Sequence, residues 1–271
     1  ARLASRWGLW SAYPARTRPG RTRWIPFAVT LALLGLGWWA ITSAEAMEPM
    51  VLPAPGTVAS RMIEQARTGI AWTYLEPTIF AAALGALISM VVAIPLGIVM
   101  AHSRLAAAIG EPVVALSQTI PMVALAPLLV VWIGYGTLPI AMLCAIISFF
   151  PMVTTTMIGF RSLDMRVIEN ALLDGSHVTQ RLWHVELPMA APAILAGVRG
   201  GVVLAMTGAV VGELVMGGEG IGTLLTLVRQ AADTAGVFAL VIWTSAAALL
   251  LHAVVLIAER AAVSRLQSEA S

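Results

Sequence analysis

Six long apolar segments dominate this chain and leave it few possible folds. They lie at about 24–43, 78–101, 114–134, 138–160, 189–212 and 237–258. An apolar stretch of about 20 residues can cross a bilayer as an α-helix, which satisfies its own backbone hydrogen bonds there. Charged residues make up only 11% of the 271 residues, against about 25% in a soluble domain. The sequence therefore predicts an all-α polytopic membrane protein with six transmembrane helices.

The polar segments between these runs predict the domain organisation. A Pro/Gly-punctuated stretch precedes a short interfacial helix at 57–68, in which Val58, Met62 and Ile63 share one face. Ala44-Glu45-Ala46 fits a signal-peptide cleavage pattern, but the apolar run before it is longer than usual, and we expect an uncleaved first span. The predicted parts are a tail at 1–23, a first transmembrane helix at 24–43, a loop at 44–77, a five-helix core at 78–258 with a polar loop at 161–188, and a second tail at 259–271.

Arginine counting predicts the orientation. All sixteen basic residues are arginines. If the N-terminus is cytoplasmic, twelve of them lie in cytoplasmic segments, and only Arg61, Arg67 and Arg229 lie outside. Cytoplasmic loops of membrane proteins carry an excess of basic residues. We therefore expect a multi-pass protein of the bacterial plasma (inner) membrane, with both termini and the polar loop cytoplasmic. Its surroundings are membrane lipid, and a net charge of +2 gives no sign of a nucleic-acid partner.

Helix signals divide the polar loop into two short helices. Asp164 can cap a helix that contains Val167, Ile168, Ala171 and Leu172, and Gly175 can end it, because glycine accepts a left-handed conformation. A second helix fits 177–185. Leu187-Pro188 then restarts the chain into the fifth span, since proline is tolerated in a first helical turn. From the residues alone, an ordinary amphipathic loop is an equally good interpretation.

The spacing within this loop resembles a known family motif. Glu169-x-Ala171-x-x-x-Gly175, nine residues, and Val185-x-Leu187-Pro188 resemble the EAA loop of ABC importer permeases, whose pattern is E-A-A, three residues, G, nine residues, I-x-L-P. Two positions depart from it, Asn170 and Val185. The segments LPAPGTV, IPLGIVMAHSR, QTIPMVALAPLLVVWIGYG and GELVMGGEGIGTLL are similar to permeases for nitrate, sulfonates, taurine and pyrimidine precursors of thiamine. The resemblance covers about residues 50–265.

The resemblance implies a fold, partners and a mechanism. The fold is that of a type I importer permease with a cytoplasmic coupling helix. The expected partners are a cytoplasmic ABC ATPase dimer that binds ATP and Mg²⁺, a second permease that is the same chain or a similar one, and an extracytoplasmic solute-binding protein near 44–75 and 213–236. This chain itself would hold no cofactor. The residues implied in ATPase coupling are Glu169, Ala171, Leu172, Asp174, Gly175, Ser176, His177, Arg181, Leu187 and Pro188.

Polar residues inside apolar spans are costly and are often functional. Arg199 lies within the fifth span, where it could bind an anionic substrate, reach the interface or pair with an acid. Glu213, at the outer end of the same span, is either a boundary residue or a contact beside the translocation path. Met122 and Met206 complete the candidate pathway residues. Gly197-x-x-x-Gly201 and Gly208-x-x-x-Gly212 have the spacing of close helix packing.

Two other classes of protein compete with this interpretation. A secondary transporter often has internal repeats and a buried ion site, and neither is clear here. An intramembrane enzyme would need a nucleophile and a base, for which Ser148 and His252 are candidates without motif support. The sequence contains no HExxH, P-loop or GxSxG motif, so we expect no catalytic or ATP-binding site in this chain. Cys144 is alone and matches no metal spacing, so we expect a buried hydrophobic role and no metal site.

Overall fold

The computed structural model describes residues 24–44 and 46–269, and all regular structure in these ranges is helical. The chain divides into two compact units, residues 1–57 and 58–271. In the first unit, α1 (Trp24–Ser43) is an apolar helix that matches the range expected for the first span. The loop after it is held to α1 by the indole of Trp38, whose Nε1 donates a hydrogen bond to the Pro53 carbonyl at 3.0 Å. The predicted tail at 1–23 lies outside the described residues.

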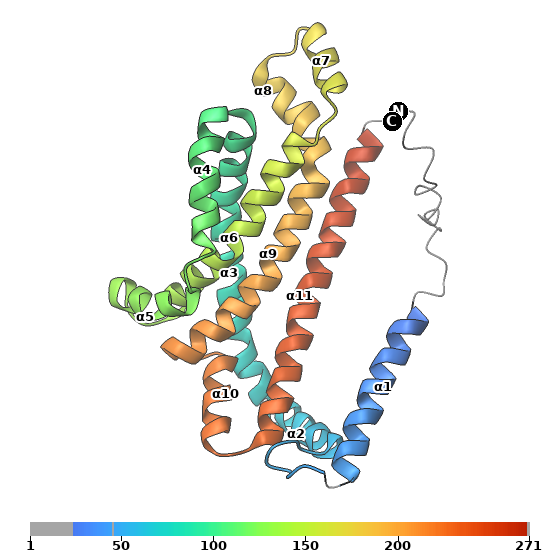
Figure 1. Ribbon diagram of the computed structural model, residues 1–271, viewed down its shortest axis with the longest axis vertical. Coiled ribbons are helices and arrows are strands. Elements are labelled where there is room, and N and C mark those ends of the chain that lie inside the picture. Colours follow the sequence, from blue (N-terminus) through green and yellow to red (C-terminus); the bar gives the residue numbers. More distant parts are fainter. Residues whose placement is uncertain (1–23, 45, 270–271) are drawn as a thin grey trace, which may run out of the picture. The chain divides into compact units, whose positions relative to one another are not determined.

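The second unit is built around three helices that pack on one another. They are α3 (Ile70–His102), α6 (Thr137–Arg161) and α9 (Leu187–Met216), and α11 (Thr234–Glu269) lies alongside α9 (Figure 1). The helix α3 begins eight residues before the expected start at 78, because the chain stays helical through Pro77. A proline in the second or third turn removes one hydrogen bond but leaves the rest of the helix intact.

Small residues allow the three central helices to approach closely. A Cβ added at Gly85 of α3 would lie 2.5 Å from the carbonyl oxygen of Ala141 and still closer to the Cβ of Cys144, both on α6. Gly201 of α9 faces Met152 and Ser148 in the same way, and Gly197, Gly208 and Gly212 also face α6. The predicted packing role of these glycines is therefore confirmed. Cys144 is fully buried at this contact, as expected.

The third apolar segment contains Pro121 and Pro127, which predict a kink or a broken start, and it forms a broken helix. The helix α4 (Arg104–Ser117) and the helix α5 (Met122–Ile133) meet at an angle of 96°, and the break lies at Ile120-Pro121. Proline disfavours a helical conformation in the residue before it, so the break has a local cause. The predicted span at 114–134 was wrong in its start, since its first residues belong to α4.

The number of spans can be compared with the expected six. Four helical stretches are long and apolar enough to cross a membrane, and the bent α4–α5 pair makes up to five. The apolar part of α1, residues 28–43, is shorter than this criterion requires. Six crossings therefore need both the bent pair and α1, and the sixth crossing stays a prediction.

Short amphipathic helices lie at the two ends of the second unit. One end carries α7 (Met165–Leu173) and α8 (Val178–Arg181), and the other carries α10 (Ile221–Gln230) (Figure 1). The predicted interfacial helix is α2 (Pro55–Arg67). Its Arg61 pairs with Glu64 at 2.8 Å and with Asp233, before α11, at 3.2 Å. The hydrogen bond to Glu64 and the charge of Asp233 raise the pKa of Arg61 above its usual value.

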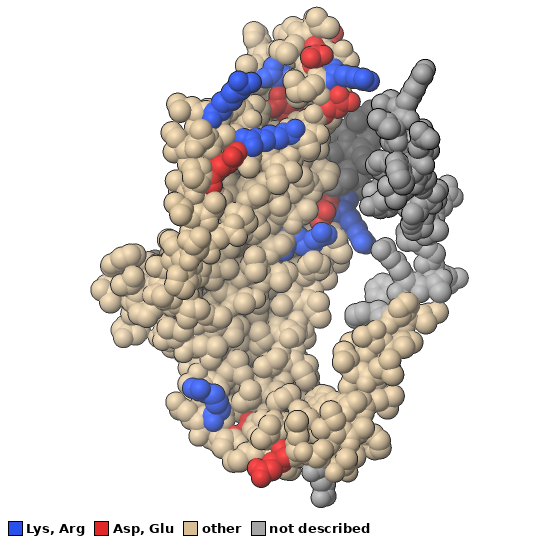
Figure 2. Space-filling view, viewed as in Figure 1, with Lys and Arg blue, Asp and Glu red and all other residues tan. Residues whose placement is uncertain are grey.

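Charged side chains follow the same division. Figure 2 shows acidic and basic side chains gathered around the end that carries α7 and α8, a further small group about halfway along the molecule, and others near the opposite end, with an uncharged zone between the last two groups. Exposed apolar side chains cover this zone, among them Leu87 and Val91 of α3 and Leu249 of α11. An uncharged apolar band between two charged ends is the surface that a lipid bilayer requires.

Candidate functional site

The first half of the polar loop folds as its sequence predicts. The side chain of Asp164 accepts a hydrogen bond from the backbone N–H of Arg166 at 3.0 Å and caps α7. The chain then turns at Gly175, whose φ of +79° is in the left-handed region. Ser176 closes the turn, because its backbone N–H and its hydroxyl both donate to the carbonyl of Ala171, at 3.1 and 2.5 Å. The turn is therefore a defined structure with its own hydrogen bonds.

The second half differs from the prediction. The helix expected at 177–185 does not end before Leu187-Pro188 but runs from α8 through a π-helical turn, Leu182–Glu186, directly into α9. Pro188 has no N–H, and in a regular helix its ring would clash with the carbonyl of residue 184. The π turn has one more residue per hydrogen-bonded turn than an α-helix, and Leu187 accordingly donates its N–H to the carbonyl of Leu182, five residues earlier. The loop is thus one short helix, a glycine turn, and the start of α9.

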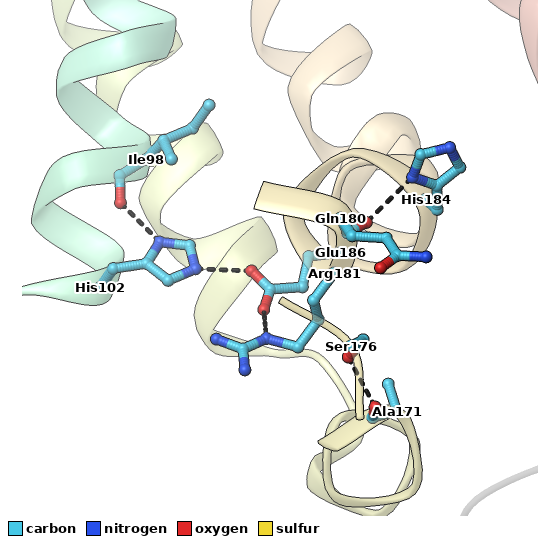
Figure 3. A network of polar contacts seen from close by, with 8 residues as sticks. All are labelled: Ile98, His102, Ala171, Ser176, Gln180, Arg181, His184 and Glu186. Carbon is cyan, nitrogen blue, oxygen red and sulfur yellow. Dashed lines mark hydrogen bonds and ion pairs between the residues drawn. The ribbon is translucent and has the colours of Figure 1, made fainter. Parts of the chain in front are cut away.

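A buried polar network lies where the loop meets the bundle (Figure 3). The carboxylate of Glu186 is only 3% exposed. Its Oε1 accepts a hydrogen bond from Nε of Arg181 at 2.7 Å, and its Oε2 lies 2.5 Å from Nε2 of His102, at the end of α3. Nδ1 of the same histidine faces the carbonyl of Ile98 at 2.8 Å. Glu186 is not among the site residues predicted from the sequence. A lone acid beside the Leu-Pro pair, five residues after an arginine, was the available signal.

The tip of the loop exposes apolar side chains beside its charges. Leu172 is 51% exposed, Leu173 85% and Val178 67%. The predicted coupling residues fall into three groups: Glu169, Ala171 and Leu172 on α7, Asp174, Gly175, Ser176 and His177 in the turn, and Arg181, Leu187 and Pro188 at the base. The residues of the turn are mostly exposed. The residues at the base are partly buried, so they lie where the loop joins the helix bundle.

The pathway candidates lie apart from one another. Nη1 of Arg199 forms an ion pair with Oε2 of Glu259 on α11 at 3.3 Å, which is the pairing with an acid that was one of its expected roles. Met206 is buried, with 1% of its surface exposed, and Met122 packs beside a small cluster around Leu143. Arg199 and Met206 lie seven residues apart on α9, and Met122 is the first residue of α5.

Glu213 is buried at 2% exposure in a second polar cluster, which fixes the start of α10. Its Oε2 accepts hydrogen bonds from the hydroxyl of Thr78 on α3 at 3.0 Å and from the N–H of Gly222 at 2.8 Å. The same threonine hydroxyl accepts the N–H of Ile221 at 2.8 Å. A carboxylate at a helix N-terminus satisfies otherwise unpaired N–H groups. A cavity of about 330 Å³ adjoins this cluster, lined also by Glu219 and Thr137.

No group of three or more acidic, histidine or cysteine side chains with metal-binding geometry occurs among the described residues. The polar clusters are hydrogen-bonded within the chain. Each cluster connects two or more helices, which is an arrangement that can transmit movement between them. The fold and the loop together define a helical membrane transport component.

The comparisons with known proteins agree with this class. Residues 93–267 match the family described as "Binding-protein-dependent transport system inner membrane component", and the chain belongs to this family. It is 37% identical over 210 residues to the riboflavin transport system permease protein of Chloroflexus aurantiacus, covering 78% of each chain. It is 29% identical over 201 residues to the taurine transport system permease protein of Escherichia coli, covering 72% of this chain and 73% of the relative.

A solved structure shows the same fold. The chain aligns with one chain of the inward-facing methionine ABC transporter MetNI with a TM-score of 0.61 and 16% identity, covering 73% of this chain and 98% of that one. The predicted type I importer permease fold is therefore confirmed. The chain is a multi-pass inner-membrane component of an ABC importer.

Proposed function

We propose that the α7–α8 loop of this permease is the surface on which a cytoplasmic ABC ATPase dimer docks. The observation that carries the proposal is the structure of the loop itself. Its tip combines exposed Leu172 and Leu173 with exposed charges, and its turn is held by the hydrogen bonds of Ser176. A rigid element joined without a break to a long helix can pass on a rigid-body movement, as alternating access requires.

The remaining partners follow from the same arrangement. With the loop in the cytoplasm, both termini are cytoplasmic, and the end that carries α10 faces outward, where a solute-binding protein would deliver the substrate. ATP and Mg²⁺ would be bound and ATP hydrolysed by the ATPase rather than by this chain. A second permease, most simply another copy of this chain, would complete the pathway.

For the substrate, we propose a small solute of the kind carried by the relatives. These relatives are named as permeases for riboflavin, formylaminopyrimidine and taurine. Nitrate and sulfonates are anions and taurine is a zwitterion with a sulfonate group, whereas the pyrimidines are neutral heterocycles. Arg199, the one basic candidate for the pathway, is already paired with Glu259. This pairing favours a heterocycle over an anion.

The docking proposal is tested by co-purification of the permease with its ATPase in mild detergent. Gly175→Val forces a β-branched residue into the left-handed conformation, and Glu169→Ala removes an exposed charge of α7. A distorted turn should weaken ATPase binding by about tenfold or more, the equivalent of about 1.4 kcal/mol. Gly200→Ala is the control, since an added Cβ there meets nothing within 4 Å. Undiminished ATPase binding by both loop variants would contradict the proposal, as would a wild-type chain that binds no ATPase.

A further inference from the structure

The junction between the coupling loop and α9 is a π turn, and a π turn is a weak point in a helix. Its i→i+5 hydrogen bonds are rarer and less regular than those of an α-helix, and helices kink where such turns occur. Movement of a docked α7 has to pass through Leu182–Glu186 before it reaches α9. Unless something holds this turn, bending there would absorb the movement.

Arg181 and Glu186 form an ion pair whose spacing depends on the π turn. Residues five apart in a regular α-helix lie about 140° apart around the axis, because each residue advances by about 100°. Their side chains then point in different directions. The wider π turn brings the two residues onto neighbouring faces, so that Nε of Arg181 reaches Oε1 of Glu186 at 2.7 Å. The ion pair and the π turn therefore stabilise each other.

His102 connects the same carboxylate to another span. Both of its ring nitrogens have a polar partner, since Nε2 faces Oε2 of Glu186 and Nδ1 faces the carbonyl oxygen of Ile98. The ring also packs edge-on against Phe160 of α6, with centroids 5.4 Å apart. Figure 3 shows Glu186 between Arg181 on one side and His102 on the other. Three helices thus meet at the base of the loop.

Burial makes this network costly to disturb. Glu186 is 3% exposed, and a buried charge without its partners is strongly unfavourable. Bending at the π turn would separate Glu186 from Arg181 or from His102. The other ion pair at this end, Arg161 with Glu111, differs in that both side chains are more than two-fifths exposed. Exposed pairs contribute little to rigidity.

We propose that Glu186 is a positioning residue that holds the π turn between the coupling loop and α9, so that movement of the loop reaches α9 and α3 instead of being absorbed at the junction. The inference rests on the proposed docking of the ATPase for its functional consequence. The holding of the turn itself can be measured on the full chain alone.

The first test is hydrogen exchange on the full chain in detergent. In Glu186→Gln, which keeps the shape but loses the charge, the amides of residues 183–187 should exchange at least about tenfold faster than in the wild type. His102→Gln should give the same local effect, and the double variant should be no worse than either single variant, since residues that act as one unit are not additive. Glu111→Gln is the matched control and should leave these amides unchanged. Unchanged exchange in Glu186→Gln and His102→Gln overturns the proposal.

The second test measures transmission in the complex with the ATPase. Cys144 is fully buried, so a cysteine placed at exposed Glu219, beyond the far end of α9, can carry an environment-sensitive fluorophore selectively. In Glu186→Gln the ATPase should still co-purify and hydrolyse ATP, while the fluorescence change per ATP hydrolysed should fall about tenfold, within the usual range of coupling between sites. A ratio within twofold of the wild type overturns the proposal. If the wild-type permease does not bind the ATPase, the proposed docking is contradicted. The hydrogen-exchange experiment would still decide whether Glu186 holds the π turn.

Discussion

The contact between α3 and α6 at Gly85 allows a sharp prediction about what holds the bundle together. In Gly85→Ala the new methyl group would overlap the carbonyl oxygen of Ala141, at 2.5 Å, and the Cβ of Cys144. Both obstacles are on or next to the backbone, so the two helices have to separate. Overpacking costs about 1–3 kcal/mol, and because neither obstacle can move without the backbone, we expect a cost of about 2–3 kcal/mol here. The intrinsic gain of about 1 kcal/mol for replacing glycine by alanine in a helix offsets part of this cost. The net destabilisation should be about 1–2 kcal/mol.

The fully buried thiol of Cys144 provides the assay. A thiol-reactive dye added during a thermal ramp in detergent reports when this single cysteine becomes accessible. One kcal/mol shifts Tm by about 2–4 °C in a domain of this size, so Gly85→Ala should lower Tm by about 2–8 °C. Gly97→Ala, which presses on Thr156 and on the carbonyl of Val153 at 2.9 Å, should give a similar loss at a site remote from the thiol.

The control for this experiment is Gly200→Ala on α9. Its added methyl group meets nothing within 4 Å, so only the helix-propensity gain remains and Tm should stay equal or rise slightly. Two results would refute the reasoning. One is a Gly85→Ala protein as stable as the wild type, which would mean that the helices separate without cost. The other is an equal loss of stability in Gly200→Ala.

Two further predictions concern the buried polar contacts. Thr78→Val removes the hydroxyl that accepts the N–H of Ile221 and donates to Glu213, and should lower the free energy of unfolding by about 1–3 kcal/mol, as measured by the same thermal assay. Thr73→Val, at an exposed site five residues earlier, should change it by less than about 0.5 kcal/mol, and equal effects of the two would contradict the assignment. Arg199→Leu should also destabilise the protein, because it leaves the carboxylate of Glu259 without its partner, and Arg199→Leu with Glu259→Leu should recover most of the loss. Additive losses in the double variant would show that the pair contributes nothing.

Features encoded by neighbouring residues could be predicted from the sequence. Asp164 and Gly175 marked the cap and the turn of the coupling loop, because capping and a positive φ depend on the local chain. The glycines of α9 predicted close packing, because their spacing places them on one helix face. The family motif predicts that the loop is the coupling element, which stays a prediction, whereas the match to the family model confirms the family.

Features that depend on distant residues could not be predicted. The sequence suggested a break before Leu187-Pro188, because proline usually starts a helix, but a π turn carried the helix through. Glu186 occupies the variable position of the Val185-x-Leu187-Pro188 motif, so the motif gives it no role. Its partner His102 is 84 residues away, and no neighbouring residue indicates that contact. Arg199 left several roles open until Glu259 was seen beside it. In an apolar bundle, the tertiary packing of the helices determines which of the few polar side chains contact each other.

The two buried carboxylates together suggest how the helices of this bundle move. Glu186 contacts His102 of α3 at one end, and Glu213, on the same continuous helical stretch, contacts Thr78 of α3 at the other. The contacts on α3 are 24 residues apart, which is about 36 Å of α-helix, close to the thickness of a bilayer. Between them the helices touch through apolar and small side chains, and such contacts alone set no unique register against sliding. Polar contacts at both ends fix the register of the antiparallel pair, because a slide by one turn would separate Glu186 from His102 and Glu213 from Thr78 and leave each buried carboxylate without its partner on α3. The helices α3 and α9 should therefore move as one body, so that a push at the coupling loop appears at the start of α10.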